Sequence, residues 1–187
     1  MIFKETRLEG AFIVEMEPIK DNRGFFARAW CQEEFEARGL ISCFVQNNIT
    51  FSPKKGTLRG LHYQIPPYGE AKLVRCTQGA IYDVMIDLQP ESPTYGQWLG
   101  VELTANNRKM IYMPGGFAHG YQVLADGTEV FYQVGQFYAP EYERGIRWDD
   151  PAFAIDWPII PPPVLSEKDT RWPDFSPPNH QNSDPQE

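Results

Sequence analysis

The sequence predicts an all-β protein folded as a double-sheet jelly roll, also called a double-stranded β-helix, with one or two short helices. Runs rich in β-branched and aromatic residues recur about every 8–12 residues, and turn-forming residues separate them, as in a sandwich or barrel. Only one segment has a convincing helical pattern. With 187 residues the chain fits one domain. We expect that domain over residues 1–175 and a flexible tail over residues 176–187.

Composition and charge exclude several classes of protein. No apolar run approaches the roughly 18 residues of a membrane helix, and the charged start of the chain is not a signal peptide. The three cysteines are an odd number without a Cys-x-x-Cys pair, which indicates a reducing cytoplasm. The net charge of -8 disfavours nucleic-acid binding. It leaves room for an anionic small molecule, because arginines and lysines gather in the first half of the chain, although each alone could be an ordinary surface charge.

The first elements are a strand, a turn and a helix. Apolar residues alternate with others over residues 11–16, which predicts a strand, and Asp-Asn-Arg-Gly over residues 21–24 predicts a turn. A helix is expected over residues 32–39, because its good helix formers begin with acids, Arg38 lies in its last turn and Gly39 can act as the C-terminal cap.

Strands dominate the middle of the chain. We expect them over residues 44–52, 60–64, 72–78, 80–88, 98–104, 109–113, 120–125 and 128–138. Within residues 80–88 the even-numbered side chains are apolar or aromatic and share one face, whereas Asp83 and Asp87 lie on the other. Pro-Pro, Gln-Gly, Asn-Asn, Pro-Gly-Gly and Asp-Gly sequences separate the strands.

The end of the chain differs from the rest. Prolines crowd it from Pro158 onward, so regular helix or sheet is not expected there. We expect this segment to wrap around the barrel, with Trp157, Trp172 and Phe175 as its anchors. The polar, proline-rich residues beyond Phe175 form the expected flexible tail.

The stretch over residues 54–64 gathers two lysines, an arginine, a histidine and two glycines around one expected strand. Arg59 and His62 are three positions apart, so on a regular strand they face opposite sides. A bulge at Gly60 would bring both to the same side. A histidine beside an arginine suggests a base next to a bound anion.

Two histidines lie in compact motifs, His62 in Gly-Leu-His-Tyr-Gln and His119 in Gly-Phe-Ala-His-Gly. The second motif resembles the later signature of cupins, but Gln64 stands where a metal-binding cupin places a second histidine, so we expect no metal. A buried histidine can serve as a general base, because imidazole titrates near neutral pH, or can be a purely structural hydrogen-bonding group. Likewise Tyr132 could be an acid or a core residue, and Asp169 could simply lie in a turn that Ser166 caps.

The combination of motifs carries a family resemblance. In chain order they are Asp21-x-Arg23-Gly24-x-Phe26, Gln46-x-Asn48, Lys55 to Gln64, Lys72-Leu73-Val74-Arg75, Tyr82-Asp83-Val84, Pro114-x-Gly116-Phe117-Ala118-His119-Gly120, Tyr132, Trp148-x-Asp150-Pro151 and Ser166-x-Lys168-Asp169. With them the chain resembles the dTDP-4-dehydrorhamnose 3,5-epimerases, metal-free cupins that act on nucleotide-linked 4-keto-6-deoxy sugars. The resemblance covers nearly the whole chain up to Phe175.

The resemblance implies a catalytic set that needs no cofactor. His62 would be the base, oriented by Asp169, and would remove a proton next to the ketone. Lys72 would stabilise the negative charge that grows on the C4 oxygen, and Tyr132 would return a proton from the opposite face. The product would be inverted at C3, C5 or both.

The resemblance also implies the partners. The substrate would be a nucleotide-diphosphate-linked 4-keto sugar, and the protein would be a homodimer with exchanged N-terminal strands. Arginines would pair with the diphosphate and Tyr138 would stack on the base. The substrate-binding residues would be Arg23, Phe26, Arg28, Gln46, Asn48, Arg59, His119, Tyr138, Glu143 and Lys168.

One position departs from the family pattern. Arg28 stands where these enzymes commonly carry an acid that contacts the nucleotide, so the identity of the base stays open. The alternatives are an epimerase acting at C3 only or C5 only on a CDP- or GDP-sugar, a cupin that binds sugar nucleotides without turnover, and a metal-dependent cupin oxygenase or isomerase.

Overall fold

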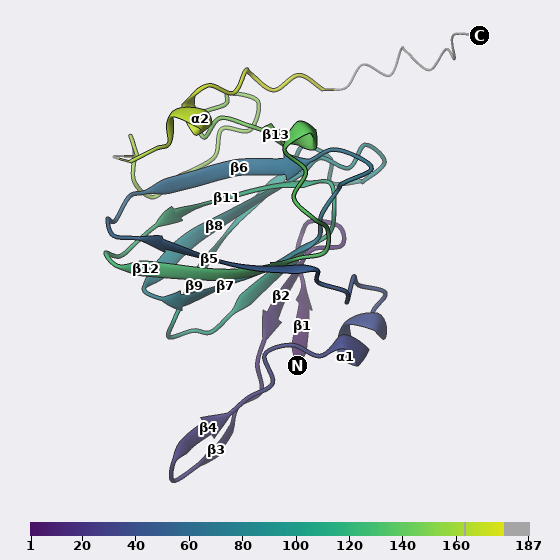
Figure 1. The fold of residues 1–187 in the computed structure, drawn as a ribbon, viewed down its shortest axis with the longest axis vertical. Helices are drawn as coiled ribbons and strands as arrows, with labels where there is room; N and C mark the ends of the chain where they lie inside the picture. Colours follow the sequence, from purple (N-terminus) through teal and green to yellow (C-terminus); the bar gives the residue numbers. More distant parts are fainter. Residues whose placement is uncertain (163, 178–187) are drawn as a thin grey trace, which may run out of the picture.

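Two antiparallel sheets face each other in the computed structural model, which describes residues 1–162 and 164–177 (Figure 1). The six-stranded sheet has the order β1-β2-β10-β7-β12-β5, and the five-stranded sheet has the order β13-β6-β11-β8-β9. A separate hairpin pairs β3 with β4. The predicted all-β double-sheet architecture is confirmed.

The strands lie where the alternating patterns predicted them. Their bounds are β1 Ile2–Glu5, β2 Phe12–Glu15, β3 Ile19–Asp21, β4 Gly24–Phe26, β5 Gln46–Ser52, β6 Leu58–Gln64, β7 Lys72–Gln78, β8 Ala80–Asp87, β9 Trp98–Thr104, β10 Met110–Met113, β11 Phe117–Val123, β12 Thr128–Val134 and β13 Glu143–Gly145. Strands β1, β3, β4 and β13 were not predicted, because three or four residues show little alternation; the equally short β2 and β10 were found within predicted strands of six and five residues.

Helices are short and peripheral. Helix α1 spans Gln32–Glu36 and stops earlier than predicted, with Ala37 as its C-cap; Gly39 takes its positive φ of 69° in the turn that follows. Helix α2 spans Glu167–Thr170, where the Ser166 hydroxyl accepts a hydrogen bond from the Asp169 N–H, so the capped turn suggested by the sequence is present. None of the described helices is long and apolar enough to cross a membrane.

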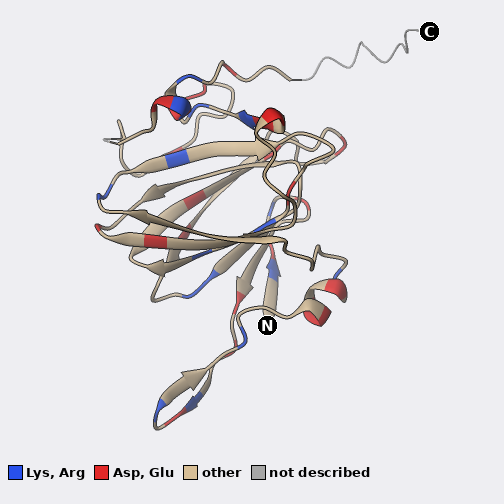
Figure 2. Cartoon of the chain, viewed as in Figure 1, with Lys and Arg blue, Asp and Glu red and all other residues tan. Residues whose placement is uncertain are grey.

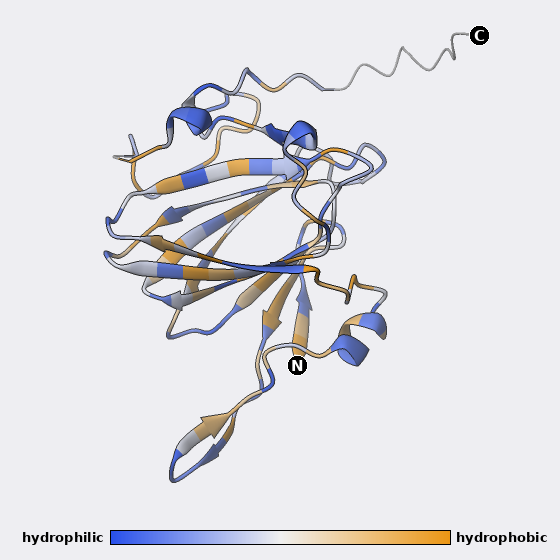
Figure 3. Ribbon diagram, in the orientation of Figure 1, coloured by the Kyte–Doolittle hydropathy of each residue, from blue (hydrophilic) through white to orange (hydrophobic). Residues whose placement is uncertain are grey.

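Strand β8 shows how the core is built. Ile81 and Met85 point into the space between the sheets, where both are completely buried. Val84 and Ile86, on the other face, pack beneath the C-terminal segment together with Trp157. Like β8, strand β6 carries both hydrophobic and hydrophilic residues (Figure 3).

The C-terminal segment covers the outer face of the five-stranded sheet. Trp157 and Phe175 pack into that apolar cluster, as predicted. Trp172 instead lies next to His62, with the two ring centroids 6.4 Å apart. The tail predicted over residues 176–187 falls outside the described residues from residue 178 onward.

The β3–β4 hairpin projects away from the two sheets (Figure 1). Its apolar side chains are bare, since Ile19 is 71% exposed and Phe26 is 70% exposed. Charged residues of both signs mark the hairpin, whereas α1 is acidic (Figure 2). A second exposed apolar pair, Ile49 and Phe51, lies on the outer face of β5.

Candidate active site

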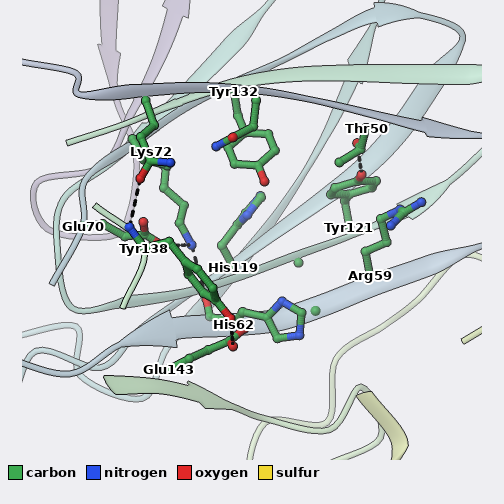
Figure 4. A pocket seen from close by; sticks show the side chains of 15 residues that line it. Thr50, Arg59, His62, Glu70, Lys72, His119, Tyr121, Tyr132, Tyr138 and Glu143 are labelled. Atoms are coloured by element: carbon green, nitrogen blue, oxygen red, sulfur yellow. Dashed lines mark hydrogen bonds and ion pairs between the residues drawn. The ribbon is translucent and has the colours of Figure 1, made fainter. Parts of the chain in front are cut away.

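A cavity of about 440 Å³ lies between the two sheets (Figure 4). Its walls are made by side chains of β5, β6, β7, β11 and β12 and by the residues that follow β12. The lining residues are Gln46, Asn48, Thr50, Arg59, Gly60, His62, Glu70, Lys72, His119, Gly120, Tyr121, Tyr132, Val134, Tyr138 and Glu143. Most residues predicted for the site therefore meet in one place.

A bulge in β6 brings Arg59 and His62 to the same cavity. On the neighbouring strand β11, His119 pairs with His62 and Tyr121 pairs with Arg59, so three steps along β6 match two steps along β11. Gly60 is the extra residue, with φ of 103°. A Cβ at Gly60 would lie 2.6 Å from the backbone of β11, so only glycine fits. The predicted bulge is confirmed.

His62 is held by a buried carboxylate from the C-terminal segment. Its Nε2 lies 2.6 Å from Oδ1 of Asp169, whose residue is 4% exposed. The other oxygen of Asp169 accepts the Gly60 N–H at 3.4 Å. Burial acts to raise the pKa of Asp169, but the hydrogen bonds and charge of His62 outweigh it, so the pKa is lowered. Asp169 therefore stays ionised behind the imidazole and fixes its orientation.

Tyr132 and Lys72 come from the opposite wall. Tyr132 lies on β12 and Lys72 begins β7, both in the six-stranded sheet, whereas His62 belongs to the five-stranded sheet. Burial, and then the negative charge of Glu70, raise the pKa of Tyr132, which keeps its phenol protonated. The Lys72 ammonium is nearly buried and lies 2.9 Å from the Glu70 carboxylate. The cavity thus has an imidazole on one side and a protonated phenol on the other.

A second histidine–aspartate pair lies on the same wall as His62. Nε2 of His119 is 2.9 Å from Oδ2 of Asp83, a completely buried residue of β8. His119 lines the cavity, as predicted for a substrate contact. The pairing of His119 with Asp83 was not predicted. The available signal was that Asp83 lies on the inward face of its strand, where a carboxylate away from solvent needs a buried partner.

One end of the cavity holds a polar network. The Tyr138 hydroxyl donates to Glu143 at 2.7 Å, and Lys168 forms an ion pair with the same carboxylate oxygen. The hydrogen bond to Glu143 raises the pKa of Tyr138 to about 12. Gln46 accepts the backbone N–H of Tyr138 at 2.9 Å. Tyr138 is 55% exposed, so the face of its ring is open to a ligand.

Four predicted binding residues do not line this cavity; one of them, Lys168, lies next to it through its ion pair with Glu143, and the other three lie farther away. Arg23 and Phe26 belong to the projecting hairpin, and Arg28 follows it. The Arg23 guanidinium pairs with Asp21 and its side chain is 85% exposed. Arg28 lies 3.4 Å from Glu34 of α1.

Three polar side chains that line the cavity were missed by the sequence interpretation. Thr50 follows Gln46 and Asn48 at the two-residue period of β5, and its hydroxyl lies 2.6 Å from that of Tyr121. Tyr121 in turn is two positions after His119, and Glu70 is two positions before Lys72. For Thr50 and Tyr121 the strand period was the available signal, whereas Glu70 precedes β7 and was indicated only by its closeness to Lys72 in the sequence.

The described residues hold no cluster of three or more His, Cys, Asp or Glu side chains suited to a metal ion. Both cavity histidines have a ring nitrogen next to a carboxylate instead. Base, ammonium and phenol around one cavity suit the removal and return of a proton next to a carbonyl group.

Comparisons with known proteins show the family of the chain. The model of the dTDP-4-dehydrorhamnose 3,5-epimerase family matches residues 5–177. The dTDP-4-dehydrorhamnose 3,5-epimerase of Pseudomonas aeruginosa is 47% identical over 169 residues, which cover 89% of this chain and 92% of the relative.

Solved structures give the same result. The crystal structure of dTDP-4-dehydrorhamnose 3,5-epimerase from Elizabethkingia anophelis aligns with a TM-score of 0.91 and 39% identity, over 94% of this chain and 96% of that one. The dTDP-6-deoxy-D-glucose-3,5-epimerase of Legionella pneumophila, in complex with dTDP-4-keto-L-rhamnose, aligns with a TM-score of 0.83 and 39% identity, over 90% and 89% of the two chains. The chain belongs to the dTDP-4-dehydrorhamnose 3,5-epimerase family.

Proposed function

We propose that this protein is a cofactor-independent epimerase that converts dTDP-4-dehydro-6-deoxy-D-glucose into dTDP-4-dehydro-L-rhamnose by inverting C3 and C5. The observation that carries the proposal is the placement of the carboxylate-backed His62 and the protonated Tyr132 on opposite walls of one cavity, with the Lys72 ammonium lining it. Family membership and the keto-sugar complex of the Legionella relative support the substrate class.

Each inversion is a proton removal followed by a proton return. His62 takes the proton from the carbon next to the ketone, and the C–H electron pair becomes the C=C bond of an enolate with its charge on the C4 oxygen. The Lys72 ammonium stabilises that charge, which exists only after proton removal, so it lowers the barrier. Tyr132 then gives its proton to the other face of the carbon and recovers one from solvent, and His62 releases to solvent the proton that it took. Asp169 stabilises the imidazolium in the meantime.

Residues in and next to the cavity match the chemical groups of the nucleotide part of the substrate. Arg59 offers a guanidinium fork to the diphosphate, and the exposed ring of Tyr138 offers a stacking surface to the base. Gln46, Asn48, His119, Glu143 and Lys168 supply further polar contacts.

We further propose a homodimer in which the β3–β4 hairpin of one copy reaches the cavity of the other. This arrangement would bring Arg23, Phe26 and Arg28 to a substrate that they do not reach within their own chain. The bare apolar hairpin and the exposed Ile49 and Phe51 support it, because such surfaces are usually covered. A single domain over residues 1–175 and a cytoplasmic location remain predictions from the sequence.

The test is proton exchange with solvent. Incubation of dTDP-4-dehydro-6-deoxy-D-glucose with the protein in deuterated water should place deuterium at C3 and C5. Nuclear magnetic resonance measures the deuterium at each carbon. Exchange at one carbon alone would point to the single-centre alternative, and faster exchange with a CDP- or GDP-linked sugar would reassign the base. Tight binding without exchange would overturn the proposal in favour of a non-catalytic binding protein.

A further inference from the structure

One partner of an ion pair inside the cavity, Glu70, has no role in the proposed proton transfers. The Glu70 carboxylate lies 2.9 Å from the Lys72 ammonium, and the two side chains are only 13% and 7% exposed. Both line the cavity (Figure 4). Such a pair has lost most of its contact with water, so its geometry is set by the protein.

The ammonium of Lys72 has three N–H donors, and two of them have partners in the wall. One points to Glu70, and a second reaches the backbone carbonyl of His62 at 3.5 Å. The third donor is left for the cavity. Two fixed acceptors thus determine the direction of the third N–H, and one of them belongs to the residue that carries the base.

Glu70 is itself held in place by close packing of two turns. A Cβ at Gly115 would lie 3.2 Å from the backbone of Gly69 and 3.5 Å from that of Glu70. The Pro-Gly-Gly turn before β11 therefore presses directly on the backbone that carries the carboxylate. This packing fixes the position of the Glu70 backbone, from which the side chain extends.

The charge of Glu70 alone does not favour the reaction. Its negative charge helps to raise the pKa of Tyr132 and, after the larger effect of Glu143, that of Tyr138. The same charge would oppose an enolate forming nearby. What Glu70 can contribute to catalysis is therefore the position of the ammonium.

We infer that Glu70 is a positioning residue, which holds the Lys72 ammonium so that its remaining N–H points at the oxygen that becomes negative. This inference rests on the proposed epimerase function. It predicts that the shape of residue 70 matters more than its charge.

Two conservative variants separate shape from charge. Glu70→Gln keeps the length and an oxygen acceptor but loses the charge, so its kcat should stay within about threefold of the wild type. Glu70→Asp keeps the charge but shortens the side chain, so its kcat should fall by about tenfold or more with KM changed by less than about threefold. The opposite order, or no effect of either variant, would overturn the inference.

A double-mutant cycle tests whether Glu70 acts through Lys72. In a Lys72→Met background, Glu70→Asp should lower the residual exchange rate by less than about twofold. An equal loss in both backgrounds would overturn the inference. Glu102→Asp, an exposed carboxylate on β9, is the matched control and should leave kcat unchanged. An inactive wild type would instead overturn the proposed function, and with it the inference.

Discussion

At the scale of single residues, the proposed base has a partner from the far end of the chain. His62 and Asp169 are separated by 107 positions, yet their side chains lie 2.6 Å apart. Asp169 is held in turn by the Ser166 cap and the Gly60 N–H. The imidazole therefore has one defined orientation at the wall of the cavity.

Substitutions of His62 and of Tyr132 should have different effects on proton exchange and on inversion. His62→Ala should lower deuterium exchange into the substrate by about 1000-fold, because no base remains. Tyr132→Phe should keep measurable exchange but lower the rate of inversion by about 100-fold, because the proton can still leave and return on the side of His62. Nuclear magnetic resonance measures exchange and inversion together, with circular dichroism as the folding control. Equal small effects would mean that the roles are wrong.

Asp169 also makes stability depend on pH. Its pKa is lowered in the folded state, so its contribution is fully present above its unfolded pKa of about 3.9 and is lost as the pH falls through the folded value. The difference in unfolding free energy between the wild type and Asp169→Asn should be constant above about pH 5 and shrink below about pH 4. Urea unfolding across this range measures it. A difference that does not change with pH would contradict the assignment.

At the scale of elements, the bulge in β6 decides which residues share the cavity. On a regular strand Arg59 and His62 would face opposite sides of the sheet. The extra residue at Gly60 turns both inward, and this requires the close approach of β6 to β11. The conformation of Gly60 thus places Arg59, the expected diphosphate contact, and His62, the proposed base, in the same cavity.

Gly60→Ala should therefore cost both stability and activity. The new Cβ would strike the backbone of β11 at a positive φ, so we expect a loss of about 3 kcal/mol or more in unfolding free energy. Gly96→Ala is the matched control, since Gly96 has φ of 75° and nothing within 4 Å of the added carbon. It should cost only about 1–2 kcal/mol. Chemical denaturation compares the two, and equal costs would show that the close approach is unimportant.

At the scale of the whole molecule, the hairpin and the cavity of the same chain lie apart. The hairpin residues predicted to bind substrate lie outside it, with Phe26 70% exposed. The separation between the hairpin and the cavity is a property of the fold, because the hairpin extends away from both sheets (Figure 1). A second copy is the partner that could use this hairpin.

Complementation between two inactive chains tests that exchange. Arg23→Ala should lower the activity of the homodimer about tenfold or more, because a diphosphate contact is lost. A heterodimer of an Arg23→Ala chain and a His62→Ala chain should regain about half of the wild-type rate, since one of its two cavities would combine an intact His62 with an intact Arg23. Two affinity tags isolate the heterodimer. Failure to regain activity would show that Arg23 acts within its own chain or not at all.

Local patterns were enough to predict most of the strands, the turns and the family. Alternation located nine of the strands, and the compact motifs around His62 and His119 pointed to the site before any contact was known. The same local patterns failed where elements are very short, as in β13, and where a helix ends, as in α1. Short segments carry too few residues for a period to be recognised.

The sequence by itself determined the fold class and the kinds of groups available for chemistry, because both depend on neighbours along the chain. Only the tertiary structure decided which groups meet. It paired His119 with Asp83, placed Glu70 against the Lys72 ammonium and kept the hairpin out of its own cavity. The physical reason is that distances across a cavity are set by sheet packing, bulges and turns acting together, and no single segment contains that information.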